Sequence, residues 1–548
     1  MTADPTEIPA PSTRGPAVWV PCAAVLACLL VFLPRSMLWA ERFALPKEAA
    51  LHAGALACSL LVLARARAPR LDAVDMGACL FALLGMVSAV AVALNPWNGW
   101  RAALLTSSAV LLFLAARTVA GERGDTLLLE GIGWAVTALA VSALLEAYGV
   151  VDGLSTAGRA PGGALGNRNR AAHLMVLGLP VLWAALMRAP TRRRAAALLG
   201  CTASAAAMLA LSHTRAAWLA AMVMAACAVA ARLAIAPRAA PRRRTVGFAC
   251  AAAVGIVLAI VTPNALRWAG GGGYAATMRR IGEYDAGSGR GRLFQYGITM
   301  RMAGDHPVLG VGPGNWSLHY LRYAPSQAAP SAAIVPVDRF PQSDWLGFAA
   351  ERGLPALGIL AYTGWLLLAW AWTTARAGAS PPAERDQALA LASWVAALLV
   401  LGALDVVLLT PAGACFVAVA GGALAPAREG GPVRLPRAAR WSFALLMVAL
   451  TAVPLTLGVQ RIRAGSLVGN WFAPRPDEDR LVRAVAIDPA SYEARAVLAR
   501  ALVQRGRCDE AAPHLAAAER LFPGAPYLAR LRDGCARRGR RRGEQQLR

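Results

Sequence analysis

The sequence predicts an all-α protein: a polytopic integral membrane helical bundle with a large loop late in the chain and a small helical domain at the C-terminus. Of its 548 residues, 57% are hydrophobic and only 16% are charged, against about 25% charged in an ordinary soluble domain. The mean hydropathy is +0.47. Apolar residues this abundant cannot all be hidden in one or two soluble cores, so a bilayer must cover much of the surface. This composition excludes most classes of soluble enzyme.

Runs of about 17 to 25 apolar residues predict about 13 transmembrane helices. The predicted spans are 17–34, 49–64, 75–93, 100–120, 127–148, 170–187, 194–212, 215–235, 246–262, 353–374, 386–409, 411–425 and 440–459. The first run lacks a basic segment before it and a small-residue cleavage site, so it is predicted to be a retained helix rather than a signal peptide.

The arginines predict the orientation of these helices. The net charge is +25, and Lys47 is the only lysine, so nearly all of the cations are arginine. They cluster in predicted loops, which the positive-inside rule would place in the cytoplasm: 65–74, 188–193, 236–245, 375–385 and 426–439. A compositional bias toward Ala, Arg, Gly and Pro explains the arginine content equally well. Neither reading requires nucleic acid as a partner.

This orientation divides the chain into five parts. They are a cytoplasmic tail (1–16), a first helical block (17–262), a large periplasmic loop (263–352), a second helical block (353–459) and a periplasmic C-terminal domain (460–548). The loop is too long for a simple connection and combines Trp, Tyr, His, Asp and Arg, whereas a linker would be rich in Ser or Gly. We therefore expect a folded, partly membrane-embedded element that carries the chemistry.

The C-terminal domain contains a repeat. Ala484 and Pro489 recur as Ala518 and Pro523, a period of 34 that is typical of tetratricopeptide helix pairs. One complete repeat is predicted at about 492–525. Fewer than three repeats are marginal alone, so the tail is expected to rest on the membrane domain or a partner protein. A Cys508–Cys535 disulfide fits an oxidising compartment, although two unrelated thiols fit equally well.

Two helix starts combine polar residues with arginine. Asn167, Asn169 and Arg170 open the helix at 170–187, where free backbone N–H groups and arginines suit an anion. An ordinary cap with interfacial arginines is the alternative. Arg215 follows a very short turn and opposes the helix macrodipole, so it is explained either by an anionic partner or by snorkelling to lipid headgroups.

The large loop supplies the remaining candidate residues. Arg292 precedes aromatic residues and a glycine-rich segment (306–316), and His319 follows. Asp344 and Glu351 are seven residues apart, on one face of a helix that continues into an apolar run. Acidic residues at membrane depth are costly and usually functional. Solvation near the interface is the alternative for Glu351.

These residues together resemble the bacterial O-antigen ligases and polymerases over about residues 20–425. The resemblance rests on helix number and on the order of five motifs: Gly166–Asn169, Thr214-Arg215, Arg292 to the glycines Gly310 and Gly312, Pro341–Leu346, and Glu351 with Gly353 and Leu354. Similar proteins also carry tetratricopeptide tails. The family implies a GT-C-like helical bundle in the bacterial inner membrane.

The resemblance also implies a reaction. In that family, loop arginines hold the pyrophosphate of an undecaprenyl-linked glycan and a loop histidine activates the acceptor hydroxyl, without a metal or other cofactor. By position, Arg215 and Arg292 would hold pyrophosphate, because guanidinium groups match phosphate oxygens in pairs. Arg170, Asn167, Asn169 and Glu351 would complete the donor site.

One departure from the family concerns the base. Gln342-Ser343 stands where the family has His-Asn, and glutamine cannot act as a general base. Three accounts follow: Asp344 takes the proton, His319 or His306 reaches in from the same loop, or transfer activity has been lost. We rank Asp344 first, because it lies in the matching segment and can titrate.

The predicted function is therefore glycosyl transfer from undecaprenyl pyrophosphate to an acceptor hydroxyl on lipid, glycan or protein. The partners are the lipid-linked glycan, membrane lipid and a protein bound by the tail. One alternative is an inactive relative that binds lipid-linked glycan as an assembly scaffold. Another is a transporter or flippase, for which Asp405 is one intramembrane candidate.

Overall fold

The computed structural model describes residues 15–64, 71–121, 125–156, 158–235, 243–267, 273–279, 287–324, 334, 340–377, 380–427 and 437–546. Within these residues the chain forms helices and turns without strands, as the predicted all-α class requires. The helices of the bundle are α1 (Gly15–Leu30), α2 (Leu45–Ala64), α3 (Ala73–Ala91), α4 (Pro96–Val119), α5 (Asp125–Ala147), α6 (Arg168–Arg188), α7 (Arg192–Leu211), α8 (Arg215–Ile235), α9 (Arg243–Val261), α13 (Asp344–Arg376), α14 (Pro382–Leu404), α15 (Pro411–Leu424) and α16 (Arg437–Val468).

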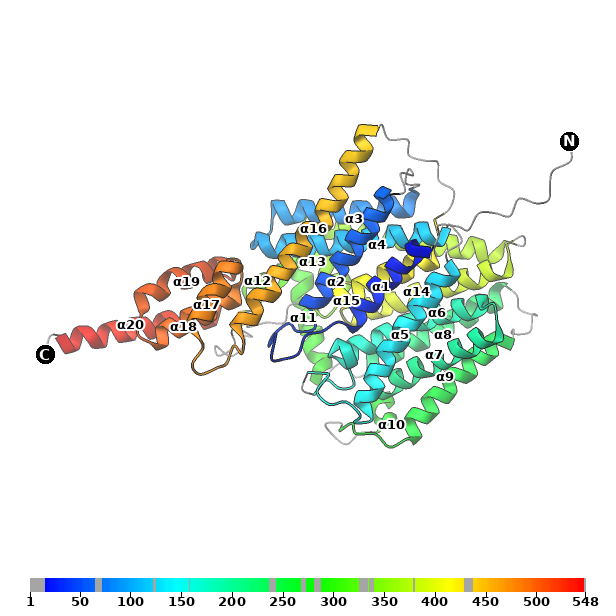
Figure 1. Cartoon of the computed structure of the whole chain (residues 1–548), viewed down its shortest axis with the longest axis horizontal. Coiled ribbons are helices and arrows are strands. Elements are labelled where there is room, and N and C mark those ends of the chain that lie inside the picture. The colour runs from blue at the N-terminus through cyan, green and yellow to red at the C-terminus, as the bar shows by residue number, and fades with distance from the viewer. Residues whose placement is uncertain are drawn as a thin grey trace.

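Ten of these helices are long and apolar enough to cross a membrane: α3 to α9, α13, α14 and α16. The protein is therefore a polytopic helical membrane protein, as predicted. The apolar helices at Val18–Leu30 and Pro411–Leu424 are shorter than a full span. The described residues thus contain fewer full-length spans than the 13 predicted, although each predicted span corresponds to a helix (Figure 1).

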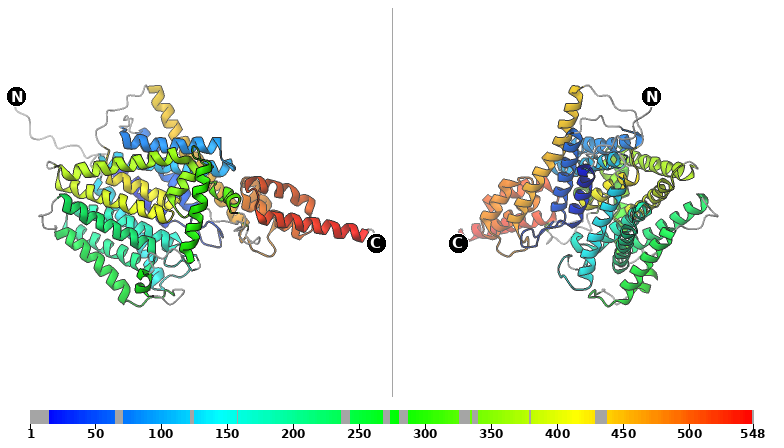
Figure 2. Two further views of the ribbon diagram at one scale, coloured as in Figure 1. Left: turned by 180° about the vertical axis from the view of Figure 1, so that it is seen from behind. Right: turned by 45° about the vertical axis from the view of Figure 1, so that its right-hand side comes forward.

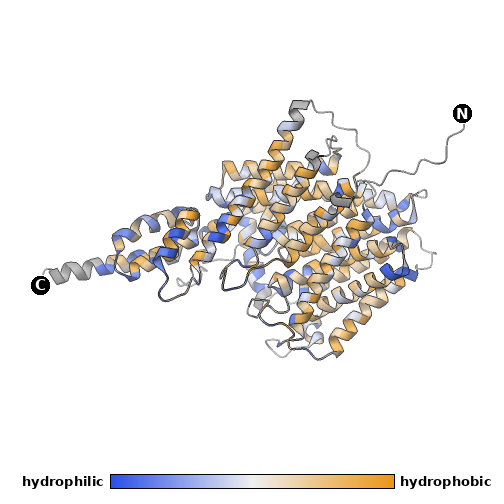
Figure 3. Ribbon diagram, viewed as in Figure 1, coloured by the Kyte–Doolittle hydropathy of each residue, from blue (hydrophilic) through white to orange (hydrophobic). Residues whose placement is uncertain are grey.

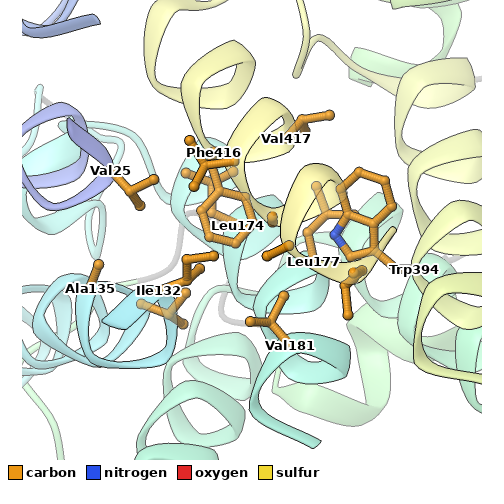
Figure 4. Close-up of a cluster of buried hydrophobic side chains, with 14 of the residues drawn as sticks. Val25, Ile132, Ala135, Leu174, Leu177, Val181, Trp394, Phe416 and Val417 are labelled. Carbon is orange, nitrogen blue, oxygen red and sulfur yellow. The ribbon is translucent and has the colours of Figure 1, made fainter. Parts of the chain in front are cut away.

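Helix α6 lies at the centre of the bundle. In its most apolar segment, 83% of the residues are buried, the highest share among the ten candidate spans. Figure 4 shows its side chains between those of four other helices, namely Val25 of α1, Ile132 of α5, Trp394 of α14 and Phe416 of α15. A residue near the start of α6 is therefore held by packing on several sides.

The large loop is folded. It contains α10 (Tyr274–Arg279), α11 (Gly287–Asp305) and α12 (Trp316–Tyr323). The last part of the predicted loop is also helical, because α13 starts at Asp344, and the non-helical residue Gly353, with a φ of 83°, divides α13 into two parts. The predicted boundary at residue 353 coincides with this break, and the division into loop and second block stays a prediction.

Two arginines at helix ends form ion pairs with acids at the starts of neighbouring helices. Arg117 at the end of α4 forms ion pairs with Asp72 and Asp75 at the start of α3, and Arg188 at the end of α6 forms one with Asp125 of α5. Of the arginine clusters that predicted the orientation, residues 65–70, 236–242 and 428–436 lie outside the described residues.

The tail consists of α17 (Glu478–Ile487), α18 (Tyr492–Gln504), α19 (Cys508–Leu521) and α20 (Pro526–Gln546), which project from the other end of the bundle beyond α16 (Figures 1 and 2). Figure 3 shows more hydrophilic residues here than in the bundle. The tail core includes Leu318 and Ile334 of the large loop. Cys508 and Cys535 form a disulfide. The assignment of these helices to the tetratricopeptide class stays a prediction.

Candidate active site

A cavity of about 510 Å³ lies between the membrane bundle and the tail. Its walls come from α2, α4, α6, α12, the break in α13, the α14–α15 link, α16 and the tail. Cavities of this size hold small-molecule ligands. Of the residues predicted from the sequence, Arg170 and Glu351 line it. The described lining residues do not include Asn167, Asn169, Arg215, Arg292, His319, Gln342 or Asp344.

Beside one end of the cavity lies Asp405, directly after α14 and next to the lining residue Val406. Its Oδ2 accepts a hydrogen bond of 2.9 Å from Nη2 of Arg292, and Nε2 of His173 lies 3.7 Å from the same oxygen. Arg170 lies within electrostatic reach of this carboxylate and of Arg159. The structure thus gathers two predicted arginines, from α6 and α11, around one acid. Arginine is in excess there, which suits a ligand with more than one negative charge.

The start of α6 positions Arg170 and His173. Asn167 caps the helix, since its side-chain oxygen accepts a hydrogen bond of 2.9 Å from the amide of Asn169. Gly166 has a φ of 69°, and a Cβ at this position would lie 2.3 Å from the ring of Phe43. Because residues three apart lie on one face of a helix, the side chains of Arg170 and His173 point the same way. The predicted polar motif therefore acts here as a helix cap.

The turn between α7 and α8 lies beside this helix start. The Thr214 hydroxyl is 3.3 Å from the side-chain oxygen of Asn169, which places Arg215 near the start of α6. His213 has a φ of 49° and its ring centroid is 4.4 Å from that of Tyr274. Burial, and secondarily the charge of Arg168, lowers the pKa of His213 to about 4. The His213 imidazole is thus packed against Tyr274 in this turn and is neutral at ordinary pH.

The glycine-rich segment and the break in α13 form one structural unit. The amide of Gly312 donates to the carbonyl of Glu351, and the amide of Leu354 donates to that of Pro307. A Cβ at Gly353 would lie 2.1 Å from the carbonyl oxygen of Val308, so glycine is required by space as well as by φ. These two motifs, predicted separately, position Glu351 at the cavity wall.

The Asp344 carboxylate is hydrogen-bonded to the backbone of the α14–α15 link. Its Oδ2 accepts hydrogen bonds from the amides of Val407 and Leu408 at 2.8 and 2.9 Å, and its Oδ1 accepts one from Leu409 at 3.1 Å. The side chain is fully buried. Both oxygens therefore hold the α14–α15 link, and this geometry does not favour the prediction that Asp344 is the base. The adjacent Gln342 is half-buried, and its backbone carbonyl accepts a hydrogen bond from Tyr296.

His319 lies in α12 and faces His306, with ring centroids 6.0 Å apart. His306 is exposed and His319 is buried. Burial, followed by the charges of Arg322 and His306, lowers the pKa of His319 to about 4. Neither histidine is among the described residues that line the cavity. The structure therefore does not bring His319 to the predicted donor arginines at Asp405.

A second charged group lies where the cavity meets the tail. Glu48 of α2 pairs with Arg101 of α4 at 2.6 Å and with Arg461 of α16 at 3.4 Å. Asp488 and Glu493 of the tail lie within electrostatic reach of both arginines. Burial raises the pKa of Asp488, and Arg461 opposes this shift. The tail is thus joined electrostatically to three membrane helices.

Sequence reasoning missed His173 as a site residue and identified Asp405 only as a transport acid. His173 stands in an apolar run, where a histidine is easily taken for part of a buried core. The available signal was its spacing of three residues from Arg170. Asp405 and Arg292 are 113 residues apart, and no sequence pattern pairs them.

Comparison with known families gives one match to this region. Residues 200–361 match the family model described as O-Antigen ligase. This segment runs from α7 through the large loop into α13, so it contains Arg215, Arg292 and Asp344 and leaves Arg170 and Asp405 outside. No curated protein matches the chain.

Proposed function

We propose that this protein transfers a glycan from an undecaprenyl pyrophosphate donor to an acceptor hydroxyl during surface-polysaccharide assembly. The observation that carries the proposal is the placement of Arg292, in an ion pair with Asp405, and of Arg170, within electrostatic reach of the same carboxylate, beside the cavity-lining residue Val406. The match of residues 200–361 to the O-Antigen ligase model supports this class of reaction.

The chemistry of the proposed donor site follows from charge. Guanidinium groups bind phosphate oxygens through paired N–H donors, so Arg170 and Arg292 would hold the pyrophosphate, with Arg215 approaching from the α7–α8 turn. Negative charge grows on the leaving pyrophosphate as its bond to the sugar breaks. Fixed cations stabilise that charge more in the transition state than in the ground state.

The proposed placement in the inner membrane puts the cavity, the large loop and the tail on the periplasmic side. Support comes from the paired arginines Arg117 and Arg188, which lie at the opposite end of the bundle, and from the preference of arginine-rich loops for the cytoplasm. The acceptor would enter between the bundle and the tail, and the tail would also bind a partner protein.

The test uses purified full-length protein in liposomes, with a lipid-linked glycan pool and an envelope extract from the source cells. We expect release of undecaprenyl pyrophosphate, reduced about 10²–10³-fold by Arg170→Gln or Arg292→Gln. Arg193→Gln, a change at an exposed position at the start of α7, is the matched control and should leave the rate unchanged. Donor binding without release would indicate a scaffold, and translocation of intact donor would indicate a flippase.

A further inference from the structure

We infer that His173, oriented by Asp405, is the general base that takes the proton of the acceptor hydroxyl. The inference rests on the proposed transfer reaction and assigns a residue that lies outside the segment matching the family model. It also replaces the loop histidine that the family resemblance implied and this chain lacks at Gln342.

His173 is a buried polar residue at the cavity wall whose ring nitrogens lack hydrogen-bond partners among the described residues. Its side chain is 1% exposed and lines the cavity. Within the described part of the chain, neither of its ring nitrogens has a hydrogen-bond partner. A buried polar group without a partner is destabilising and uncommon. A hydroxyl bound in the cavity would supply the missing partner.

Asp405 lies on one side of this imidazole. Nε2 of His173 lies 3.7 Å from Oδ2 of Asp405, within ion-pair range once the ring is protonated. This leaves Nδ1 for the substrate, as in catalytic pairs where a carboxylate orients a histidine and stabilises its protonated form. The same Oδ2 accepts a hydrogen bond from Arg292, so the proposed base and the proposed donor site share one anchor.

Three other candidate bases are less suitable. Gln342 has no proton-accepting nitrogen. Both oxygens of Asp344 already accept backbone hydrogen bonds. His319, on α12 of the large loop, is not among the described residues that line the cavity. His173 differs from all three, because it combines an unpartnered ring nitrogen with a place in the described part of the cavity wall.

The step conserves atoms and charge. The acceptor oxygen forms a bond to the anomeric carbon of the donor sugar, and the bond between that carbon and the pyrophosphate oxygen breaks with its electron pair. The hydroxyl proton passes to Nδ1 of His173. The resulting imidazolium is stabilised by Asp405, and the released undecaprenyl pyrophosphate is held by Arg170 and Arg292. Transfer of the proton to solvent or to the pyrophosphate restores the base.

The test compares His173→Gln, His173→Gly and His319→Gln in the liposome assay. General-base catalysis contributes about 10²–10⁴-fold, so His173→Gln should lower kcat by this factor while binding of the lipid-linked donor is unchanged. Added imidazole should restore turnover to His173→Gly, because the deletion leaves room for it at the cavity wall. His319→Gln removes a buried histidine outside the cavity and should turn over as the wild type does.

The outcomes separate the two claims. If the wild type releases no undecaprenyl pyrophosphate, the proposed function fails and the inference falls with it. If the wild type is active and His173→Gln is equally active, the reaction stands and the assignment of the base is overturned. Loss of turnover that imidazole does not restore, accompanied by loss of donor binding, would show that His173 is structural and would also overturn the assignment.

Discussion

Replacing Asp344 with asparagine separates two roles for this residue that the sequence alone could not distinguish. In the structure, the carboxylate accepts three backbone hydrogen bonds from Val407, Leu408 and Leu409. These hold the α14–α15 link, and residues Val406 to Gly413, in the link and the start of α15, line the cavity. The change therefore perturbs a cavity wall without introducing or removing bulk.

The size of the effect follows from the hydrogen bonds. A hydrogen bond to a charged acceptor contributes about 1.5–3 kcal/mol, and one between neutral groups contributes about 1 kcal/mol. Asparagine has one acceptor oxygen in place of two, so it weakens the bonds to Val407 and Leu408 and places an amide N–H opposite that of Leu409. We expect the free energy of unfolding to fall by about 3 kcal/mol.

Two measurements on the purified protein test this expectation. Equilibrium unfolding in mixed detergent micelles gives the change in stability, and release of undecaprenyl pyrophosphate gives the rate per folded molecule. Asp344→Asn should be less stable and should retain turnover. Asp479→Asn, at an exposed position in α17, is the matched control. A loss of about 10²-fold or more in turnover with unchanged stability would refute the structural reading and return the base to Asp344.

Three further predictions concern regions outside the cavity. Arg117→Ala should cost about 3 kcal/mol of unfolding free energy, because it leaves the buried Asp75 of α3 and the half-buried Asp72 that caps α3 without their partner; unfolding of the Arg193→Ala variant is the comparison. The Cys508–Cys535 disulfide closes a loop of 27 residues. Its reduction should lower the free energy of unfolding of the tail by about 3–4 kcal/mol, which should appear as faster hydrogen exchange in α19 and α20 and unchanged exchange in the bundle. For His319, the folded pKa of about 4 lies below the ordinary 6.5, so the unfolded state binds more protons between these values. Stability should therefore fall as the pH drops from about 6.5 to about 4, and unfolding of His319→Gln should show a shallower slope.

The helices of the bundle could be predicted because the bilayer fixes their length and composition. Each apolar run that suited a membrane span is a helix in the structure. At α13 the sequence did not indicate the helix before the break. Glu351 could equally have been solvated near the interface, whereas in the structure both Glu351 and Arg352 are buried in a helical segment that ends at Gly353.

The candidate site could be predicted only where a local motif marks it. Arg170 was found because a helix start has a recognisable pattern, and Arg292 because a family motif includes it. No local motif includes His173, and an isolated histidine in an apolar run can equally be a core residue or a site residue.

The meaning of Asp405 depends on tertiary structure in the same way. As a lone acid at the end of an apolar run, it was a candidate residue for the transporter or flippase alternative. In the fold, α11 brings Arg292 to it and α6 brings His173 and Arg170. The charge of this carboxylate is already balanced by the Arg292 guanidinium, with the His173 imidazole beside it. Such a fixed acid is better suited to positioning these two side chains than to binding a transported solute. The same acid thus argues against the transporter alternative that it first supported.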